Sequence, residues 1–135
     1  ISKLKQIVAH AGISDAVEFL GRSDQVKEYM SRATAFLMCS ENEGMGRVSI
    51  EAMFYGCLVI GRNAGGTKDF VFDGETGLLF NDIDDCVAAM QKATETDHQY
   101  IIRYAQQFAQ ENFSIENYGC KILDVYSKVL NQTIT

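Results

Sequence analysis

Two glutamates and two glycines lie close together in the sequence, between residues 43 and 51. Gly44 and Gly46 carry no side chain, so a ligand can approach their backbone closely. A helix is predicted to begin just after them, and the free N–H groups and positive dipole at its start suit a phosphate. Glu43 and Glu51 carry carboxylates, which accept hydrogen bonds from sugar hydroxyls and do not bind phosphate. The segment therefore indicates a ligand with both phosphate and hydroxyl groups, such as a nucleotide sugar.

Each glutamate also has a purely structural interpretation. Glu43, placed before a helix, interacts favourably with the helix dipole, which stabilises a helix by about 0.3–1 kcal/mol. Glu51 can be an exposed helical side chain. These interpretations account for either residue alone, but the pair beside two glycines, directly after the apolar run at 34–39, favours a ligand site.

Short apolar strands alternate with helices along the chain. The strands are predicted at 16–21, 33–40, 57–62 and 76–80. The helices, predicted from apolar spacing and capping residues, lie at 3–12, 24–32, 49–56, 82–94, 98–112 and from Ser114 onward. This alternation predicts an α/β fold, a Rossmann-like three-layer arrangement of a parallel sheet with flanking helices. Ligands bind beyond the carboxyl ends of such strands, so the loops that follow the strands are expected to point to one site.

Helical spacing also predicts which side chains face the core. The strand at 33–40 is continuously apolar, which is typical of a strand covered on both faces. Ser23 and Ser114 are expected to cap the helices that follow them. The side chains expected to face inward are those of Val26, Tyr29, Met30, Val87, Ala88, Met90, Ile101, Tyr104, Ala105 and Phe108, with those of Tyr118, Ile122, Val125, Tyr126 and Val129 in the core or against another domain.

Composition and charge exclude several classes of protein. The 135 residues fit one domain, and an apolar content of 47% can fill one core. The net charge of −6 argues against a nucleic-acid partner, which needs a basic face. No apolar run approaches the roughly 20 residues of a membrane span, so no transmembrane segment is expected.

The cysteines and histidines indicate no further catalytic site. No two cysteines form a CxxC pair, and neither His10 nor His98 has a candidate catalytic partner nearby. Cys39 and Cys57 lie in apolar runs and are expected to be reduced, buried thiols. Reduced thiols fit a cytoplasmic protein.

The glutamates belong to a longer set of spaced residues. Its members are Glu43-Gly44-Met45-Gly46, Glu51-Ala52-Met53, Gly56, Val59-Ile60 and Gly65-Gly66. This set resembles the donor-binding half of the retaining GT-B glycosyltransferases of family 4, in which two glutamates are separated by seven residues. The resemblance runs from residue 19 to residue 114 and implies a truncated GT-B C-terminal domain.

The resemblance implies a role for each residue of the motif. Glu43 is expected to be the catalytic residue and to contact hydroxyls of the transferred sugar. Glu51 is expected to hold the ribose hydroxyls, and the loop at Gly21 and Arg22 to lie near the base. The residues expected to line the sugar and the diphosphate are Gly44, Met45, Gly46, Arg47 and Val48. The family is metal-independent, so neither a metal nor a cofactor is expected.

Four positions depart from the usual pattern of the family. Met45 stands where Phe is commoner, and Arg47 stands where an apolar residue is frequent. Leu58 stands where Pro is usual, and Asp69 where Glu is frequent. Arg47 either adds a positive charge near the diphosphate or is an exposed helical side chain. Asp69 either offers a carboxylate or caps the next helix.

Residues 1–135 are expected to form one partial donor-binding domain. The chain begins at Ile1, within a predicted helix. The resemblance places the first strands of the domain, a diphosphate-binding Arg and Lys, and an N-terminal acceptor domain upstream of it. Without those strands, exposed strand edges favour self-association. The full-length form is expected in the cytoplasm or at the periphery of a membrane.

The activity that this resemblance implies is transfer of a hexose from a UDP- or GDP-sugar to a saccharide or a lipid-linked saccharide, with retention of configuration, as in polysaccharide biosynthesis. The 135 residues alone are expected not to turn over. The alternative is a non-catalytic nucleotide-sugar-binding module, although a degenerate site has no reason to keep both glutamates. An epimerase or a sugar-phosphate synthase of the same fold is expected to lack the glycine loop followed by the helix of Glu51.

Overall fold

A three-stranded parallel sheet forms the centre of the structure. The computed structural model describes residues 1–132. The strands, in their order across the sheet, are β1 (Ala35–Met38), β2 (Leu58–Arg62) and β3 (Leu78–Phe80). The middle strand β2 is the most deeply buried, as its continuous apolar run predicts.

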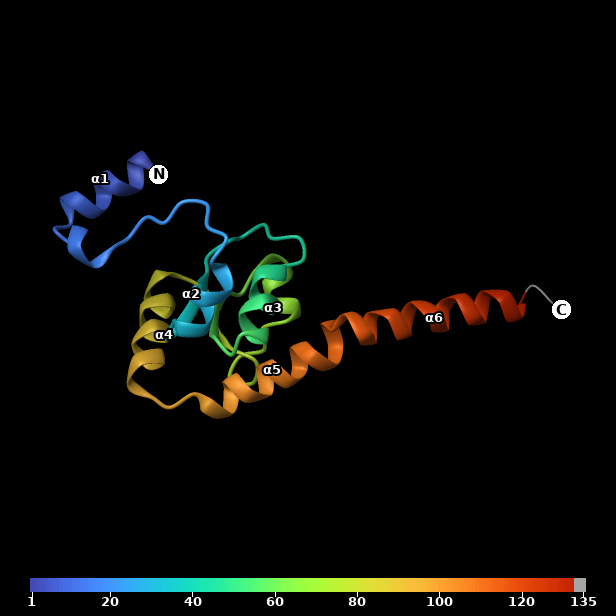
Figure 1. Ribbon diagram of the computed structural model, residues 1–135. Helices are drawn as coiled ribbons and strands as arrows, with labels where there is room; N and C mark the ends of the chain where they lie inside the picture. Colours follow the sequence, from blue (N-terminus) through green and yellow to red (C-terminus); the bar gives the residue numbers. More distant parts are fainter. Residues whose placement is uncertain (133–135) are drawn as a thin grey trace.

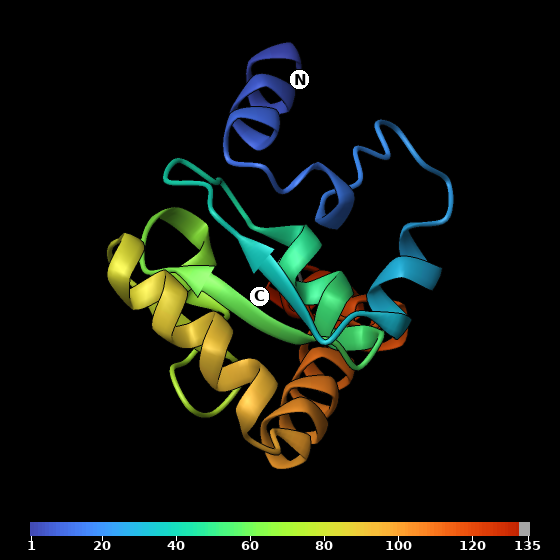
Figure 2. The same ribbon diagram turned by 90° about the vertical axis from the view of Figure 1, so that its left-hand side faces the viewer.

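Helices cover both faces of this sheet, as Figure 2 shows. The helices of the described residues are α1 (Ser2–His10), α2 (Val26–Arg32), α3 (Arg47–Phe54), α4 (Ile83–Glu95), α5 (Gln99–Phe113) and α6 (Ile115–Gln132), with short 3₁₀ turns η1 (Ser14–Ala16) and η2 (Gly65–Asp69). Helix α4 packs on one face of the sheet, and α3 and α5 pack together on the other. The α/β fold with flanking helices that the sequence predicts is therefore confirmed.

The buried side chains of β2 divide the core into two hydrophobic clusters. Val59 points toward α3 and α5, where it belongs to one cluster with Met53 and Ala105. Leu58 and Ile60 point to the opposite face, where α4 covers them. This alternation follows from the two-residue period of a strand. It places α3, which begins at the end of the glycine loop, firmly against the sheet.

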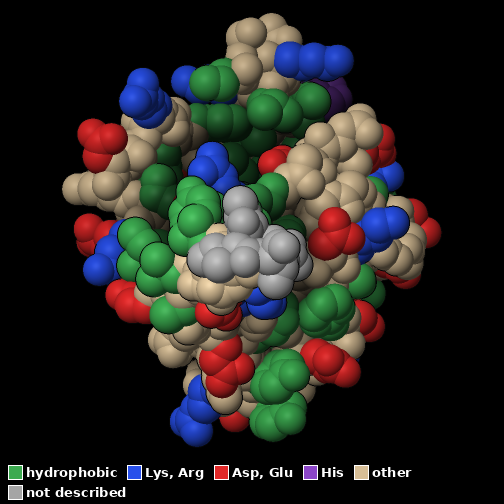
Figure 3. Space-filling view, turned by 90° about the vertical axis from the view of Figure 1, so that its right-hand side faces the viewer, with side chains coloured by type: hydrophobic (Ala, Val, Ile, Leu, Met, Phe, Trp, Pro, Cys, Tyr) green, Lys and Arg blue, Asp and Glu red, His purple; other side chains and the backbone are tan. Residues whose placement is uncertain are grey.

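The first and last helices extend away from the sheet, as Figure 1 shows. Helix α1 buries none of its residues. Helix α6 exposes many apolar side chains, among them Tyr118, Leu123, Val125, Tyr126 and Leu130. Figure 3, which faces the end of α6, shows hydrophobic side chains gathered on this side of the molecule. Even so, no helix within residues 1–132 has the length and apolar character that crossing a membrane requires.

The prediction of a strand at 16–21 is wrong. Residues 14–16 form the turn η1, and Val17 then adopts extended dihedral angles, with φ −126° and ψ 120°. However, residues 17–21 pair with no other strand among residues 1–132. An extended segment becomes part of a sheet only where a neighbouring strand exchanges backbone hydrogen bonds with it.

The prediction of which residues of α4 face the core is also wrong. Val87 and Met90 are each 48% exposed, and Ala88 is exposed as well. The residues that pack on the sheet are Ala89 and Ala93. Small side chains let this helix approach the sheet closely, and that packing turns the larger apolar side chains toward solvent.

Three other residues predicted to face inward are partly exposed. Val26 and Tyr29 are each 41% exposed, and Tyr104 is 43% exposed. Their helical neighbours Met30 and Ala105 are buried, as predicted. The helical period therefore identifies the correct side of α2 and α5, but the buried part of each helix is narrower than its apolar stripe.

Strand β1 is less covered than the sequence predicts. Leu37 is 37% exposed, and Cys39, which follows the strand, is exposed. The predictions of a doubly covered strand and of a buried Cys39 thiol are therefore wrong, because β1 lies at the edge of the sheet. Cys57 is buried as predicted, and this burial raises the pKa of its thiol.

The two serines predicted as helix caps behave differently. The Ser114 hydroxyl accepts a hydrogen bond from the Asn117 N–H at 3.3 Å, which confirms a cap for α6. The Ser23 hydroxyl accepts from the Gln25 N–H at 3.1 Å. Helix α2 begins only at Val26, so Ser23 closes the turn before the helix and does not cap it.

The carboxylate of Asp82 caps α4 and accepts a hydrogen bond from the Asp85 N–H at 2.9 Å. Replacing Asp82 with alanine is expected to lower the free energy of unfolding by about 1 kcal/mol, because the helix start loses its acceptor. Urea unfolding followed by circular dichroism measures this loss. Asp84→Ala removes the same charge from the same helical turn and serves as the control. Equal losses in the two variants would assign the effect to charge alone.

Candidate functional site

The loop between β1 and α3 carries the glycines and the first glutamate of the motif. Gly46 is the residue at which this loop turns into α3, with φ 62° and ψ 30°. These left-handed dihedral angles are readily adopted only by glycine. The Gly46 carbonyl then accepts from the Ser49 N–H at 2.9 Å and closes the first turn of the helix. The turn at Gly46 therefore aims the start of α3 toward the space beside the loop.

A second glycine pair, Gly65 and Gly66, packs against the backbone of this loop. The Gly66 N–H donates to the carbonyl of Glu43 at 2.7 Å. A side chain at Gly66 would overlap the carbonyl oxygen of Gly44, so only glycine fits there. At Gly65, which has φ +53°, an added Cβ would lie 2.9 Å from the Glu43 carbonyl oxygen. The backbone at 65–66 is thus packed directly against the backbone of the glycine loop.

Polar side chains join the loops at the carboxyl ends of all three strands. Glu41, in the loop after β1, forms an ion pair with Arg62 at the end of β2. The Asn63 side chain, just after β2, donates to the Asn81 side chain, just after β3, at 3.1 Å. The loops after these strands therefore meet at one edge of the sheet, as expected for a ligand site in a parallel α/β fold.

A cavity of about 430 Å³ lies at the start of α3. Its lining residues are Glu43, Gly44, Met45, Gly46, Arg47, Val48 and Glu51. The structure thus brings together seven of the nine residues proposed from the sequence. The other two, Gly21 and Arg22, are exposed on the segment before α2 and do not line this cavity.

The polar groups of this cavity differ along its length. Glu43 lies on the loop and is half-buried, whereas Glu51 lies one helical turn beyond Arg47 and is exposed. Between the two glutamates lie the free N–H groups and the positive dipole end of α3, which attract an anion. The arrangement therefore offers an anion site with a hydrogen-bond-accepting carboxylate on either side. Among residues 1–132, no three His, Cys, Asp or Glu side chains lie together so as to hold a metal ion.

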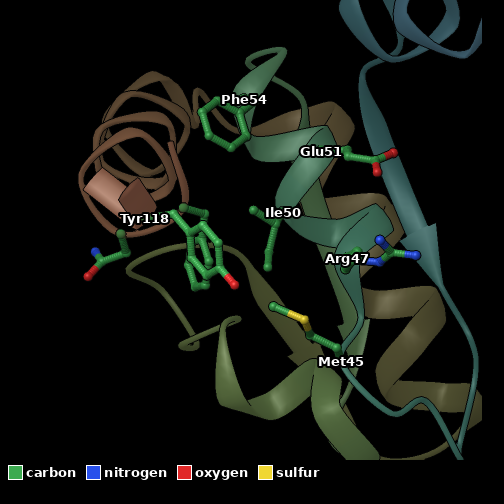
Figure 4. Close-up of a pocket in the computed structure, with 8 residues that line it drawn as sticks. Met45, Arg47, Ile50, Glu51, Phe54 and Tyr118 are labelled. Atoms are coloured by element: carbon green, nitrogen blue, oxygen red, sulfur yellow. The ribbon is translucent and has the colours of Figure 1, made fainter. Parts of the chain in front are cut away.

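A second cavity, of about 260 Å³, shares a wall with the first. Its lining residues are Met45, Arg47, Ile50, Glu51, Phe54, Asn112, Phe113 and Tyr118. Figure 4 shows Ile50 and Phe54 on the side of α3 that faces Tyr118, whereas Arg47 and Glu51 point away from that ring. Helix α3 therefore presents a polar side to one cavity and an apolar side to the other.

The sequence did not identify the apolar cavity. Phe54, Asn112 and Phe113 line it, although no motif marks them. The sequence predicts for Tyr118 only a place in the core or against another domain. These residues meet because α5 packs against α3 and α6 then turns away at Ser114. The space depends on the packing of α5 on α3 and on the angle at which α6 leaves α5. Spacing along the chain carries no signal for either.

Comparisons with known proteins agree with this geometry. Residues 2–109 match the family model described as "Glycosyl transferases group 1". The chain is 31% identical over 130 residues to N-acetyl-alpha-D-glucosaminyl L-malate synthase of Bacillus anthracis, covering 93% of this chain and 34% of that protein. It is 38% identical over 77 residues to the lipopolysaccharide core biosynthesis mannosyltransferase LpcC of Rhizobium leguminosarum bv. viciae, covering 57% of this chain and 22% of that protein.

Solved structures show the same fold. HepE of Anabaena, in complex with UDP and glucose, is similar with a TM-score of 0.81 and 26% identity, over 94% of this chain and 36% of that chain. Sucrose-phosphate synthase of Thermosynechococcus elongatus is similar with a TM-score of 0.86 and 26% identity, over 97% of this chain and 34% of that chain. The chain thus spans about a third of the length of these proteins. The family model matches most of the described residues, and this chain belongs to the glycosyl transferases group 1 family.

Proposed function

We propose that this chain is the donor-binding part of a retaining GT-B glycosyltransferase of family 4, which transfers a hexose from a UDP- or GDP-sugar to a saccharide or lipid-linked saccharide. The observation that carries the proposal is the 430 Å³ cavity, in which Glu43 and Glu51 flank the start of α3. A nucleoside diphosphate sugar has hydroxyls on both sides of its diphosphate, and this cavity has carboxylates on both sides of its anion site.

The diphosphate lies against the start of α3 in this proposal. The free N–H groups of the first turn face it, and the guanidinium of Arg47 adds positive charge at the same end of the helix. Gly44 and Gly46 leave the backbone open to the ligand. The chain therefore stabilises the negative charge of the diphosphate, which is also the leaving group of the transfer.

The two carboxylates orient the two ends of the donor. Glu51 accepts hydrogen bonds from the ribose hydroxyls, and Glu43 accepts them from hydroxyls of the hexose. Holding both ends fixes the anomeric carbon relative to the diphosphate, and such positioning is a large contribution to transfer rates. Gly21 and Arg22 take the place near the base only if the segment before α2 approaches the cavity in the full-length protein.

The named relatives support the choice of donor and reaction. HepE binds UDP and glucose, and one relative is a mannosyltransferase. The proposal includes retention of the anomeric configuration. Nuclear magnetic resonance tests it by comparing the anomeric coupling constants of donor and product. We place the full-length protein in the cytoplasm or at a membrane surface, where its donor is available.

A sugar phosphate is a second candidate acceptor, although the sequence predicts that a sugar-phosphate synthase lacks this glycine loop. The observation that favours it is the similarity to sucrose-phosphate synthase, with a TM-score of 0.86 and 26% identity. Release of UDP or GDP by the full-length protein, compared between hexose phosphates and neutral saccharides as acceptors, separates the two candidates. Faster release with hexose phosphates would replace the first proposal for the acceptor and leave the donor site unchanged.

Calorimetric titration of the full-length protein with UDP- and GDP-hexoses tests the proposed donor site. One of them is expected to bind, and Glu51→Ala is expected to weaken this binding at least about 10-fold, because hydrogen bonds to a charged group contribute about 1.5–3 kcal/mol. Glu95→Ala, which removes another exposed helical glutamate at the end of α4, is the control. Unchanged affinity in Glu51→Ala would remove the ribose role of this residue.

A further inference from the structure

Two cysteines lie at the carboxyl-end edge of the sheet, on segments far apart in the sequence. Cys39 directly follows β1, and Cys86 lies in the first turns of α4. Figure 2 shows α4 lying across the sheet with its start near the ends of the strands, so the helix runs opposite to them. Both thiols are free in the structure.

Strand β1 and helix α4 face each other across a small groove. A cavity of about 220 Å³ is lined by Ala35 and Leu37 from β1 and by Met90 and Ala93 from α4. Ala35 also packs on the same hydrophobic cluster as Cys86. One face of β1 thus faces one side of α4. Because the two elements run in opposite directions, residues later in β1 lie beside residues earlier in α4.

This opposition continues to the two cysteines. Alternation along the chain places Cys39 on the same face as Leu37, about 6.6 Å further along the strand direction. Cys86 lies four residues before Met90 on the same face of the helix, a displacement of about 6 Å in that direction. Leu37 and Met90 line one groove, and the two cysteines lie beyond its end, each one step further in the same direction along its own element.

The two thiols differ in accessibility and acidity. Cys39 is exposed, whereas Cys86 is half-buried against the sheet. Burial raises the pKa of the Cys86 thiol, and the nearby Cys39 adds to this rise through charge repulsion. Cys39 is therefore the thiol that reacts first with an oxidant in solution, and Cys86 is placed to react second.

We propose that Cys39 and Cys86 form a reversible disulfide, with a small-molecule disulfide such as oxidised glutathione as the oxidant. The Cys39 thiolate attacks one sulfur of glutathione disulfide and releases one glutathione thiolate, which takes up a proton. The Cys86 thiolate then attacks the Cys39 sulfur and releases the second glutathione. Two protein thiols are oxidised, and one glutathione disulfide is reduced to two thiols.

The proposed disulfide joins the beginning of the glycine loop to α4, which packs on the face of the sheet opposite α3. Cys39 precedes Glu41 and Glu43 in this loop, so the oxidised form restrains the segment that lines the larger cavity. The proposal concerns the two thiols themselves and stands whether or not the cavity binds a nucleotide sugar.

Peptide mapping of the native protein tests the proposal. The folded protein is treated with oxidised glutathione, digested without reduction and analysed by mass spectrometry. A peptide joining residues 39 and 86 is expected, with an intact mass lower by two hydrogen atoms, and dithiothreitol is expected to reverse both. Cys120→Ser, on α6, is expected to keep this cross-link.

The single variants separate the two steps. Cys86→Ser is expected to retain glutathione on Cys39, because no second thiol displaces it. Wild-type protein that retains glutathione on Cys39, or that joins Cys39 to Cys57 or Cys120, would overturn the proposal. Because Cys57 is only 1% exposed, its participation would show that the bond requires unfolding.

Discussion

Gly66→Ala is expected to lower the free energy of unfolding by about 3 kcal/mol, the upper part of the usual range for overpacking. The added methyl group would overlap the carbonyl oxygen of Gly44, which belongs to backbone and cannot rotate away. The two loops must therefore separate. Separation also breaks the hydrogen bond from the Gly66 N–H to the Glu43 carbonyl, which now measures 2.7 Å. Urea unfolding monitored by circular dichroism measures the loss.

Gly44→Ala is the matched control for this prediction. Nothing lies within 4 Å of a Cβ at Gly44, and its φ lies outside the left-handed region that disfavours alanine. Both variants restrict the unfolded chain in the same way, so the difference between them isolates the overlap at Gly66. Gly44→Ala is expected to stay within about 0.5 kcal/mol of the wild type. Equal stability of the two variants would show that the loops do not pack as described.

The same pair of variants links stability to the proposed site. Gly66 lies outside the 430 Å³ cavity, but it holds the Glu43 backbone that lines it. Gly66→Ala is therefore expected to weaken donor binding by displacing Glu43. Gly44→Ala adds a methyl group to the cavity wall itself and is expected to weaken donor binding without loss of stability.

The parts of the fold that local patterns determine were predictable from the sequence. Strand β2 reads as a continuous apolar run and is buried on both faces. The residues of the glycine loop and the start of α3 are contiguous, so the cavity they line follows once α3 begins after Gly46. Apart from the glycines at 65–66, predicting the residues that line this cavity requires no knowledge of distant parts of the chain.

The wrong predictions concern features that depend on neighbours in space. Residues 16–21 have strand-like alternation but no partner strand among the described residues. Cys39 continues an apolar run, yet it is exposed because β1 lies at an edge. In α4 the hydrophobic period is satisfied by several faces, and close packing selects the one with Ala89 and Ala93. Periodicity alone does not distinguish these faces.

Glu43→Gln is expected to lower the turnover of nucleotide sugar by the full-length protein about 100-fold. Glutamine keeps the size of the side chain and an acceptor oxygen but removes the charge that strengthens hydrogen bonds to the hexose hydroxyls. Charged hydrogen bonds contribute about 1.5–3 kcal/mol and neutral ones about 0.5–1.5 kcal/mol, so each bond loses about 1.4 kcal/mol. Two such bonds to the hexose lose about 2.7 kcal/mol, which corresponds to a 100-fold change in rate. The affinity for free UDP or GDP is expected to stay unchanged, because these ligands carry no hexose.

A neighbouring variant separates this role from a general effect of the loop. Glu41→Gln removes a charge two residues earlier and breaks the ion pair with Arg62. Both of its partners are partly exposed, at 33% and 58% for the Arg62 and Glu41 side chains, so the loss is expected to be at most about 1 kcal/mol. Steady-state kinetics and nucleotide titration on both variants measure the contrast. If Glu43→Gln lowers the affinity for free nucleotide as much as it slows transfer, Glu43 acts on the diphosphate end, and its assignment to the hexose is wrong.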